Sequence, residues 1–363
     1  MSKYEQVVRA VAERPWAIRR ETLDVIVALV AERASGAELT EEEIRARIGS
    51  NEAARAPYAI EVAAAAGSQR PAGIVQVLPL YGVLIPRATL FSDVSGATSL
   101  QRFSAALRAA IDDPDIGAIL VDVDSPGGMV DGCTELAADI RSYRGTKPMA
   151  AIANHEAASA AYWLATQFDE VLVTPSGQAG SIGVFSAHDD VSAAMAKLGV
   201  KRTLISAGKY KTEGNPYEPL SEEALDHYQE QVNDYYGLFT GDVAKARGVE
   251  ASAVRAGYGE GRMLTAKRAL KAGMVDRIET FEAAATRLGR AAAGRPRRRA
   301  GGFRGITGWA PDAAARLGTP LNDTDTMDGP EHEPYAEHAE RGVADVEALG
   351  DPSRPRRDSQ AKG

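Results

Sequence analysis

The residues best suited to chemistry in this sequence are a serine, two lysines and two glycines, which lie in three separate stretches. Ser159 follows an apolar run that ends near Asn154, and it precedes an apolar helical stretch that begins at Ala160. A hydroxyl in such a strand-to-helix turn lies beside free backbone N–H groups and the positive end of a helix dipole, which favour developing negative charge. Our working hypothesis is that Ser159 attacks a peptide carbonyl.

The glycines follow a second apolar run, in the stretch Asp124-Ser125-Pro126-Gly127-Gly128. Glycine takes positive φ and lets the backbone approach a ligand closely, so its N–H groups can point at an oxyanion. A Pro-Gly-Gly stretch is also common in ordinary turns. The pattern therefore marks a candidate oxyanion site that needs a nucleophile beside it.

The lysines, Lys209 and Lys211, lie in a polar loop after a predicted strand. A lysine can act as a general base for a serine if burial and nearby dipoles lower its pKa. The residues alone do not choose between the two lysines. His155 lies four residues before Ser159, but no His-Asp pair has a recognisable spacing, so we interpret His155 as a loop or pocket-lining residue.

Four stretches together resemble the signal peptide peptidase A type serine peptidases, a branch of the Clp/crotonase-like fold. They are DSPGG at 124–128, AASAAYWLA at 157–165, TPSGQAGSIGV at 174–184 and AGKYKTEGNPYEPLS at 207–221. The resemblance implies a Ser-Lys dyad without histidine, with Ser159 as nucleophile and Lys211 as base. It also implies that Ser181 orients the lysine and that the N–H groups of Gly128 and Ala160 bind the oxyanion. Ala160-Ala161 replaces the family's more frequent Gly-Gly. Alanine retains the backbone N–H donor.

The family includes membrane-bound enzymes that degrade signal peptides and phage or prophage enzymes that process capsid and scaffold proteins. The opening ERPWAIRRETLDVIVALVAERASG at 13–36 and the lysine loop resemble the phage-type members. We therefore expect a serine endopeptidase of head maturation, with a soluble bacterial peptidase of the same family as the alternative. A crotonase-like acyl-CoA enzyme and an inactive assembly scaffold remain as hypotheses from other classes.

The resemblance also implies a homo-oligomeric ring that acts on polypeptide substrates. It leaves open whether the lysine acts within its own chain or reaches a neighbouring subunit. We interpret the C-terminal tail as a solvated segment, with a docking segment for capsid or scaffold proteins as the alternative.

The elements around these residues predict an α/β layered fold of repeated β-β-α units. Apolar runs predict strands at 74–78, 83–85, 116–123, 149–153, 170–173, 201–206 and 275–278, and helices at 100–111, 130–143, 160–166, 191–198 and 221–247. We expect a helical region and linker over 1–72, a peptidase domain over 73–288 and a tail over 289–363. The tail is rich in arginine and then in acidic residues, with few large apolar ones, which predicts disorder.

Composition excludes several classes of protein. A formal net charge of -8 argues against a nucleic-acid binder, since neutralising a phosphate backbone needs a dense basic surface. The single cysteine, Cys133, allows neither an intrachain disulfide nor a thiolate zinc cluster, and we expect it to be buried early in a helix. We find no metal, phosphate or nucleotide motif, hence no cofactor, and no membrane segment. We expect a cytoplasmic protein, in the host cytoplasm or a procapsid if phage-derived.

Overall fold

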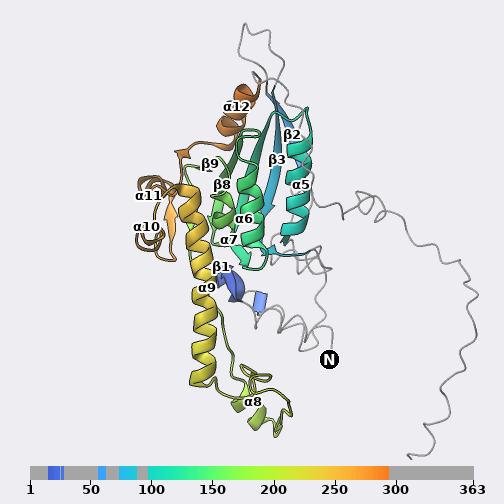
Figure 1. Cartoon of the computed structure of the whole chain (residues 1–363), viewed down its shortest axis with the longest axis vertical. Helices are drawn as coiled ribbons and strands as arrows, with labels where there is room; N and C mark the ends of the chain where they lie inside the picture. The colour runs from blue at the N-terminus through green and yellow to red at the C-terminus, as the bar shows by residue number, and fades with distance from the viewer. Residues whose placement is uncertain (1–14, 25, 28–55, 63–72, 88–96, 294–363) are drawn as a thin grey trace, which may run out of the picture. The chain divides into compact units, whose positions relative to one another are not determined.

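A mixed α/β architecture is seen in the computed structural model, which describes residues 15–24, 26–27, 56–62, 73–87 and 97–293 (Figure 1). The main sheet contains four neighbouring parallel strands: β3 (Gly73–Tyr81), β6 (Ala118–Ser125), β8 (Met149–Ala158) and β9 (Glu170–Val173). Their apolar side chains point to both faces, so both faces must be covered by helices. This is the α/β class that the sequence predicts.

Strand β8 branches, because its two ends pair with different neighbours. Its first part, Ala150–Ala153, pairs with β9, whereas its last residues pair in parallel with β10 (Gln178–Gly180). The pairing with β6 also shifts register after Val123, so that the strand bulges between its two parts. The remaining pairs are β2 (Tyr58–Val62) on β3, β11 (Met263–Thr265) on β10, and β12 (Arg277–Ile278) on β9.

Alternate residues of the strands pack into two separate apolar clusters. Ile119 and Val121 contribute to the larger one, with α5 (Leu100–Asp112), α6 (Cys133–Ser142) and α7 (Ala160–Ala165). Ala118 and Leu120 contribute to the smaller one, with α12 (Phe281–Ala292). Cys133 is the first residue of α6 and is buried, as predicted.

A second, smaller sheet carries the glycine stretch. Its order is β1 (Trp16–Ile18), β7 (Gly127–Met129), β4 (Leu84–Ile85) and β5 (Thr98–Ser99). Here the structure differs from the sequence expectations, which treated 16–18 as helical, 58–62 as linker and the Gly-Gly pair as a turn. Short strands of two or three residues have no periodicity to detect, and they form here because a partner strand satisfies their backbone groups.

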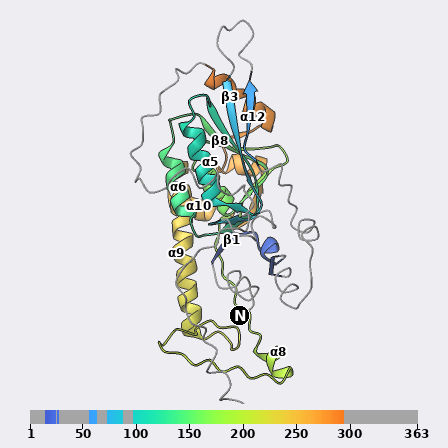
Figure 2. The same cartoon turned by 90° about the vertical axis from the view of Figure 1, so that its right-hand side faces the viewer.

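A long helix, α9 (Glu222–Arg247), extends well beyond the sheet (Figures 1 and 2). Ser221 begins it by accepting the Ala224 N–H at 3.1 Å, and Gly248 ends it in the left-handed region. Four of its five buried residues lie between Phe239 and Ala244, so the first half packs little against the body.

We use the name arm for residues 186–221, which contain α8 (Ser192–Lys197) and lead into the projecting end of α9. None of these residues is buried, and the predicted strand at 201–206 is wrong, because residues 201–206 have no helix or strand assignment. Two short helices, α10 (Ala251–Gly257) and α11 (Ala266–Lys271), follow α9. The predicted tail begins too early, because residues 289–292 belong to α12 and Gly289 and Ala292 are buried there. The rest of the tail prediction lies outside the described residues.

Candidate active site

Ser159 lies at the junction between β8 and α7, where the sequence predicts a strand-to-helix turn. Its backbone has φ 52° and ψ −118°, a conformation that a residue with a side chain rarely adopts. Such strain persists only where surrounding contacts fix it, and it is common at catalytic turns. Ser159 has only 1% of its surface exposed, and its Oγ lies 3.4 Å from the Gly183 carbonyl oxygen.

Ser181 lies beside Ser159 because the strands that precede the two serines are paired. Ala158 of β8 is opposite Gly180 of β10 in a parallel ladder, and the Ser159 N–H donates to the Gly180 carbonyl at 2.7 Å. Ser181 also has a positive φ, 55°, and its N–H donates to the Arg262 carbonyl at 3.0 Å. The two strands therefore bring these serines together from positions 22 residues apart in the sequence.

The glycine stretch contacts the same turn. A side chain at Gly127, whose φ is +99°, would collide with the Ala17 carbonyl and would place its Cβ 3.0 Å from the Cβ of Ser159. A side chain at Gly128 would collide with the backbone of Leu84 in β4. Only glycine fits at either position, so the pair allows β7 to approach both β4 and the serine turn.

Helix α7 is fixed to α9 by an aromatic stack and a shared carboxylate. The Trp163 ring stacks on Phe239 at a centroid distance of 4.6 Å, and the Trp163 Nε1–H donates to Asp242 at 3.0 Å. The other Asp242 oxygen accepts from Arg141 of α6 at 3.1 Å. One buried carboxylate thus joins three helices directly behind the serine turn.

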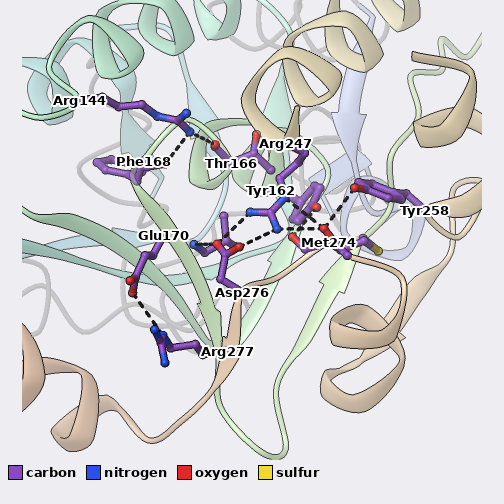
Figure 3. Close-up of polar contacts among 12 residues, drawn as sticks. Arg144, Tyr162, Thr166, Phe168, Glu170, Arg247, Tyr258, Met274, Asp276 and Arg277 are labelled. Carbon is purple, nitrogen blue, oxygen red and sulfur yellow. Dashed lines mark hydrogen bonds and ion pairs between the residues drawn. The ribbon is translucent and has the colours of Figure 1, made fainter. Parts of the chain in front are cut away.

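Arg144 caps the C-terminal end of α7. Its guanidinium donates to the carbonyls of Thr166, Gln167 and Phe168 at 2.6–2.7 Å (Figure 3). These carbonyls have no partner further along the helix, and a cation there also complements the helix dipole. Burial lowers the pKa of Arg144.

A second arginine joins α9 to the strand region around β12 (Figure 3). Arg247 donates to both carboxylate oxygens of Asp276 at 2.8 and 2.9 Å, and to the Gly273 carbonyl. Tyr162 of α7 donates to the neighbouring Met274 carbonyl at 2.8 Å. Burial alone would raise the pKa of Asp276, but the Arg247 and Val171 hydrogen bonds outweigh it and leave that pKa below its ordinary value.

The two candidate lysines both lie on the exposed arm. Lys209 forms an ion pair with Glu223 and a hydrogen bond with Tyr210, each at 2.7 Å, and these contacts raise its pKa. Within the described residues, no hydrogen bond or ion pair joins Lys211 to Ser159 or Ser181. The structure thus brings together the predicted serines and glycines, but it does not bring Lys211 to them within one chain.

His155 is exposed on the bulge of β8, three residues before the buried end of that strand. In the parts of the chain that the structure describes, no group of three or more His, Cys, Asp or Glu side chains is arranged to hold a metal ion. The same residues contain no helix that is long and apolar enough to cross a membrane.

Comparison with known families decides which class of protein this site belongs to. Residues 142–294 match the model of peptidase family S49. The chain carries a peptidase family S49 domain. The matched residues of the S49 domain include Ser159, Ser181 and Lys211, whereas Gly128 lies just before them.

Two phage proteins are similar to more than half of the chain. Capsid assembly protease C of Escherichia phage lambda is 34% identical over 228 residues, which cover 63% of this chain and 52% of the relative. Head-tail preconnector protein GP5 of Enterobacteria phage P21 is 33% identical over 219 residues, covering 59% and 43%. A putative signal peptide peptidase SppA of Enterococcus faecium is 30% identical over 179 residues, covering 49% and 52%. The chain thus spans about half the length of these relatives.

Sequence reasoning missed the contacts that hold the S49 domain's serine turn in place. Asp242 looks like an ordinary polar residue of a long helix, and only its i,i+3 spacing from the buried Phe239 marks it as inward-facing. Arg19 and Glu156, which are 137 residues apart, form an ion pair at 2.7 Å beside the serine turn. No local pattern connects them.

Proposed function

We propose that this protein is a serine endopeptidase in which Ser159 and Lys211 form a catalytic dyad. The observation that supports it most is the position of Ser159, on a strained turn that contacts both Gly127 and the residue before Ser181. Such convergence of a hydroxyl, a second hydroxyl and a glycine strand is what acyl transfer requires: a nucleophile, an orienting group and backbone donors. The match to peptidase family S49 identifies the acyl group as a peptide.

In the proposed mechanism, the Ser159 Oγ attacks the scissile carbonyl carbon while the neutral amine of Lys211 takes its proton. The N–H groups of Gly128 and Ala160 stabilise the oxyanion, and Ser181 orients the amine. Lys211 then gives the proton to the leaving amine, which yields an acyl-enzyme. Water, deprotonated by the same amine, releases the second product and restores Ser159.

Lys211 is proposed to serve the Ser159 of a neighbouring copy. It lies on the arm, where no residue is buried, and the arm leads into the end of α9 that projects from the body (Figures 1 and 2). The arm and the adjoining end of α9 expose large apolar side chains, among them Leu198, Ile205 and Leu225. Exposed apolar side chains of this kind are typical of a surface that binds another protein. A closed ring of such copies would complete every site.

The biological role proposed is the processing of capsid or scaffold proteins in phage head assembly. The two phage relatives, one of them named a capsid assembly protease, support this role over that of a bacterial housekeeping peptidase. The full fold is proposed to be of the Clp/crotonase-like type, and the substrates to be extended polypeptides that reach sites inside a ring in the procapsid or cytoplasm. The region beyond 289 is proposed as the segment that engages capsid or scaffold partners.

The direct test is cleavage by the purified full-length chain, with casein and the chain's own tail as substrates. We expect cleavage that stops in a Ser159→Ala variant with an unchanged melting temperature. An acyl-CoA thioester assayed in parallel separates the crotonase-like alternative. Turnover of the thioester but not of casein, or casein cleavage that survives Ser159→Ala, would contradict the proposal.

A further inference from the structure

The short strand β1 lies against the glycine strand of the candidate active site. Trp16, Ala17 and Ile18 pair antiparallel with Met129, Gly128 and Gly127. On its other side, β1 exchanges two hydrogen bonds with Phe185, where Trp16 donates at 2.8 Å and accepts at 3.0 Å. A three-residue segment from the start of the chain is therefore bound on both edges, between β7 and the chain that follows Ser181.

The register places a backbone carbonyl of β1 against the proposed oxyanion donor. Trp16 uses its N–H and C=O toward Phe185, and successive strand residues direct these groups to opposite sides, so those of Ala17 face β7. The Arg19 N–H, two residues on, donates to Pro126 on that same side at 2.9 Å. The Ala17 carbonyl accordingly lies opposite Gly128 and close to Gly127, which itself contacts Ser159.

Side chains hold β1 in this position at both flanks. Trp16 and Ile18 pack with Val83, Ile85 and Phe185 in an apolar cluster of their own, whereas Ala17 points the opposite way into the main core. Arg19 forms its ion pair with Glu156, three residues before the nucleophile. Ser159 is consequently buried in a chain whose β1 is in place.

We infer that β1 occupies the position of the substrate strand, so that Trp16–Ile18 is an internal pseudosubstrate that must leave before a polypeptide can bind. Resting on the proposed function, the inference adds the binding mode and the residue preference. Peptidases hold substrates as extended strands, and β7 and Phe185 offer a strand backbone partners on both edges. The replacing substrate is an extended peptide with a small residue where Ala17 lies and apolar residues where Trp16 and Ile18 lie.

The first test loosens β1 through its charge anchor. Arg19→Glu places a second carboxylate beside that of Glu156, and their repulsion should loosen β1. We expect the initial rate of casein cleavage to rise by about fivefold, because the substrate position is then more often free. The matched control is Arg20→Glu, because the Arg20 side chain is 83% exposed, against 38% for Arg19, and its ion pair, with Asp24, is local to its own helix. An Arg19→Glu chain that cleaves at the wild-type rate, while hydrogen exchange shows its β1 amides to be freed, would overturn the inference.

The second test locks β1 in place. Trp16 and Met129 are opposite each other as a non-hydrogen-bonded pair, for which Cα atoms lie about 4.5 Å apart, within the range of a disulfide. A Trp16→Cys/Met129→Cys chain is expected to lose activity at least about tenfold on oxidation and to regain it with reductant. Each single cysteine variant is the control. Equal rates for the oxidised and reduced double variant would contradict the inference, while leaving the proposed function intact.

A third measurement needs no catalysis, so it separates the two proposals. In a Ser159→Ala chain, a saturating ten-residue peptide that copies residues 13–22 is expected to speed hydrogen exchange at residues 16–19 and to leave β2 unchanged. A version of the peptide with proline in place of Ala17 lacks the N–H that faces β7 and is expected to have no effect. If the parent peptide binds without freeing residues 16–19, β1 does not occupy the substrate position.

Discussion

The proposed nucleophile and the proposed base lie in two regions that differ in burial, packing and backbone strain. Ser159 lies on a strained turn in the body, backed by a helix whose six residues, Ala160–Ala165, are all buried. Lys211 lies on the arm, where no residue from 186 to 221 is buried. Asp242, whose side chain is 13% exposed, and Asp276, at 35%, join α9 to its neighbours, whereas both partners of the arm's ion pair, Lys209 and Glu223, are more than half exposed to solvent.

This difference indicates which parts of the proposed site form when one chain folds and which would need a second copy. Folding of one chain is sufficient to bring together the proposed nucleophile, its hydroxyl neighbour and the glycine strand. It leaves the proposed base, Lys211, on the exposed arm. Docking of the arm against another copy would shield the amine from water and bring it to a serine.

The largest expected effect distinguishes the two lysines of the arm. Lys211→Ala is expected to lower kcat for casein cleavage by about 100-fold or more, because it removes the general base. Lys209→Ala is the matched control, since it changes the same charge two residues away and removes only an exposed ion pair. It should stay within about twofold of wild type. Equal losses in the two variants would show that the arm matters only through its charge.

The next largest effect concerns stability, and it is expected when a carboxylate is removed from the body but not when one is removed from the arm. Asp242→Ala leaves the Arg141 Nη2 and the Trp163 N–H without their shared acceptor, at a side chain that is only 13% exposed, and should destabilise the chain by about 3 kcal/mol in urea unfolding. Glu223→Ala, in the arm, breaks a shorter ion pair at a side chain that is 58% exposed and should leave stability unchanged. A larger loss of unfolding free energy in Glu223→Ala than in Asp242→Ala would contradict our description of the two regions.

The pH dependence of stability offers a third way to sharpen the contrast. Because the folded-state pKa of Asp276 is lowered, its contribution is present above the ordinary carboxyl pKa of about 3.9 and is lost as pH falls through the folded value. Between pH 5 and pH 3, wild type should therefore lose more unfolding free energy than Asp276→Asn, by less than about 1 kcal/mol because solvent screens this half-exposed site. Parallel pH profiles of the two proteins would contradict this assignment.

The smallest effect on the chain's own stability is expected at the arm's apolar surface. Ile205 is 96% exposed, so Ile205→Asp should leave the melting temperature of the isolated chain unchanged and shift the oligomer toward smaller species in sedimentation. Leu270→Asp, at an exposed apolar residue of α11 in the body, is the control. If both substitutions alter assembly equally, the arm has no special part in it.

Much of the fold could be predicted because its central strands and helices repeat with a clear period. Strand β9 and helix α9 agree with the sequence prediction to within a residue, since apolar runs and a Ser-to-Gly pair of caps define them locally. Two strands that escaped prediction, β1 and β7, are only three residues long. Their existence depends on a partner strand more than 100 residues away, about which local sequence carries no information.

The candidate site likewise contains residues that local sequence could predict and one that it could not. The serine and glycine stretches could be found from residue type, and the family resemblance added Ser181, which pairing of β8 with β10 places beside Ser159. The choice of Lys211 over Lys209 rested on family resemblance and stays a prediction, because one chain does not bring either amine to Ser159. A contact formed between copies leaves no trace in the local sequence of one copy.

The central claim, that Ser159 of one copy uses Lys211 of another, is tested most directly by mixing two inactive variants. Ser159→Ala and Lys211→Ala chains, dissociated and reassembled together at equal amounts, would contain sites with an intact serine and a neighbour's intact lysine. Random mixing in a ring predicts recovery of about one quarter of wild-type casein cleavage. Each variant reassembled alone should remain inactive. A mixture that forms hybrid oligomers by native mass spectrometry and yet stays inactive would contradict the claim.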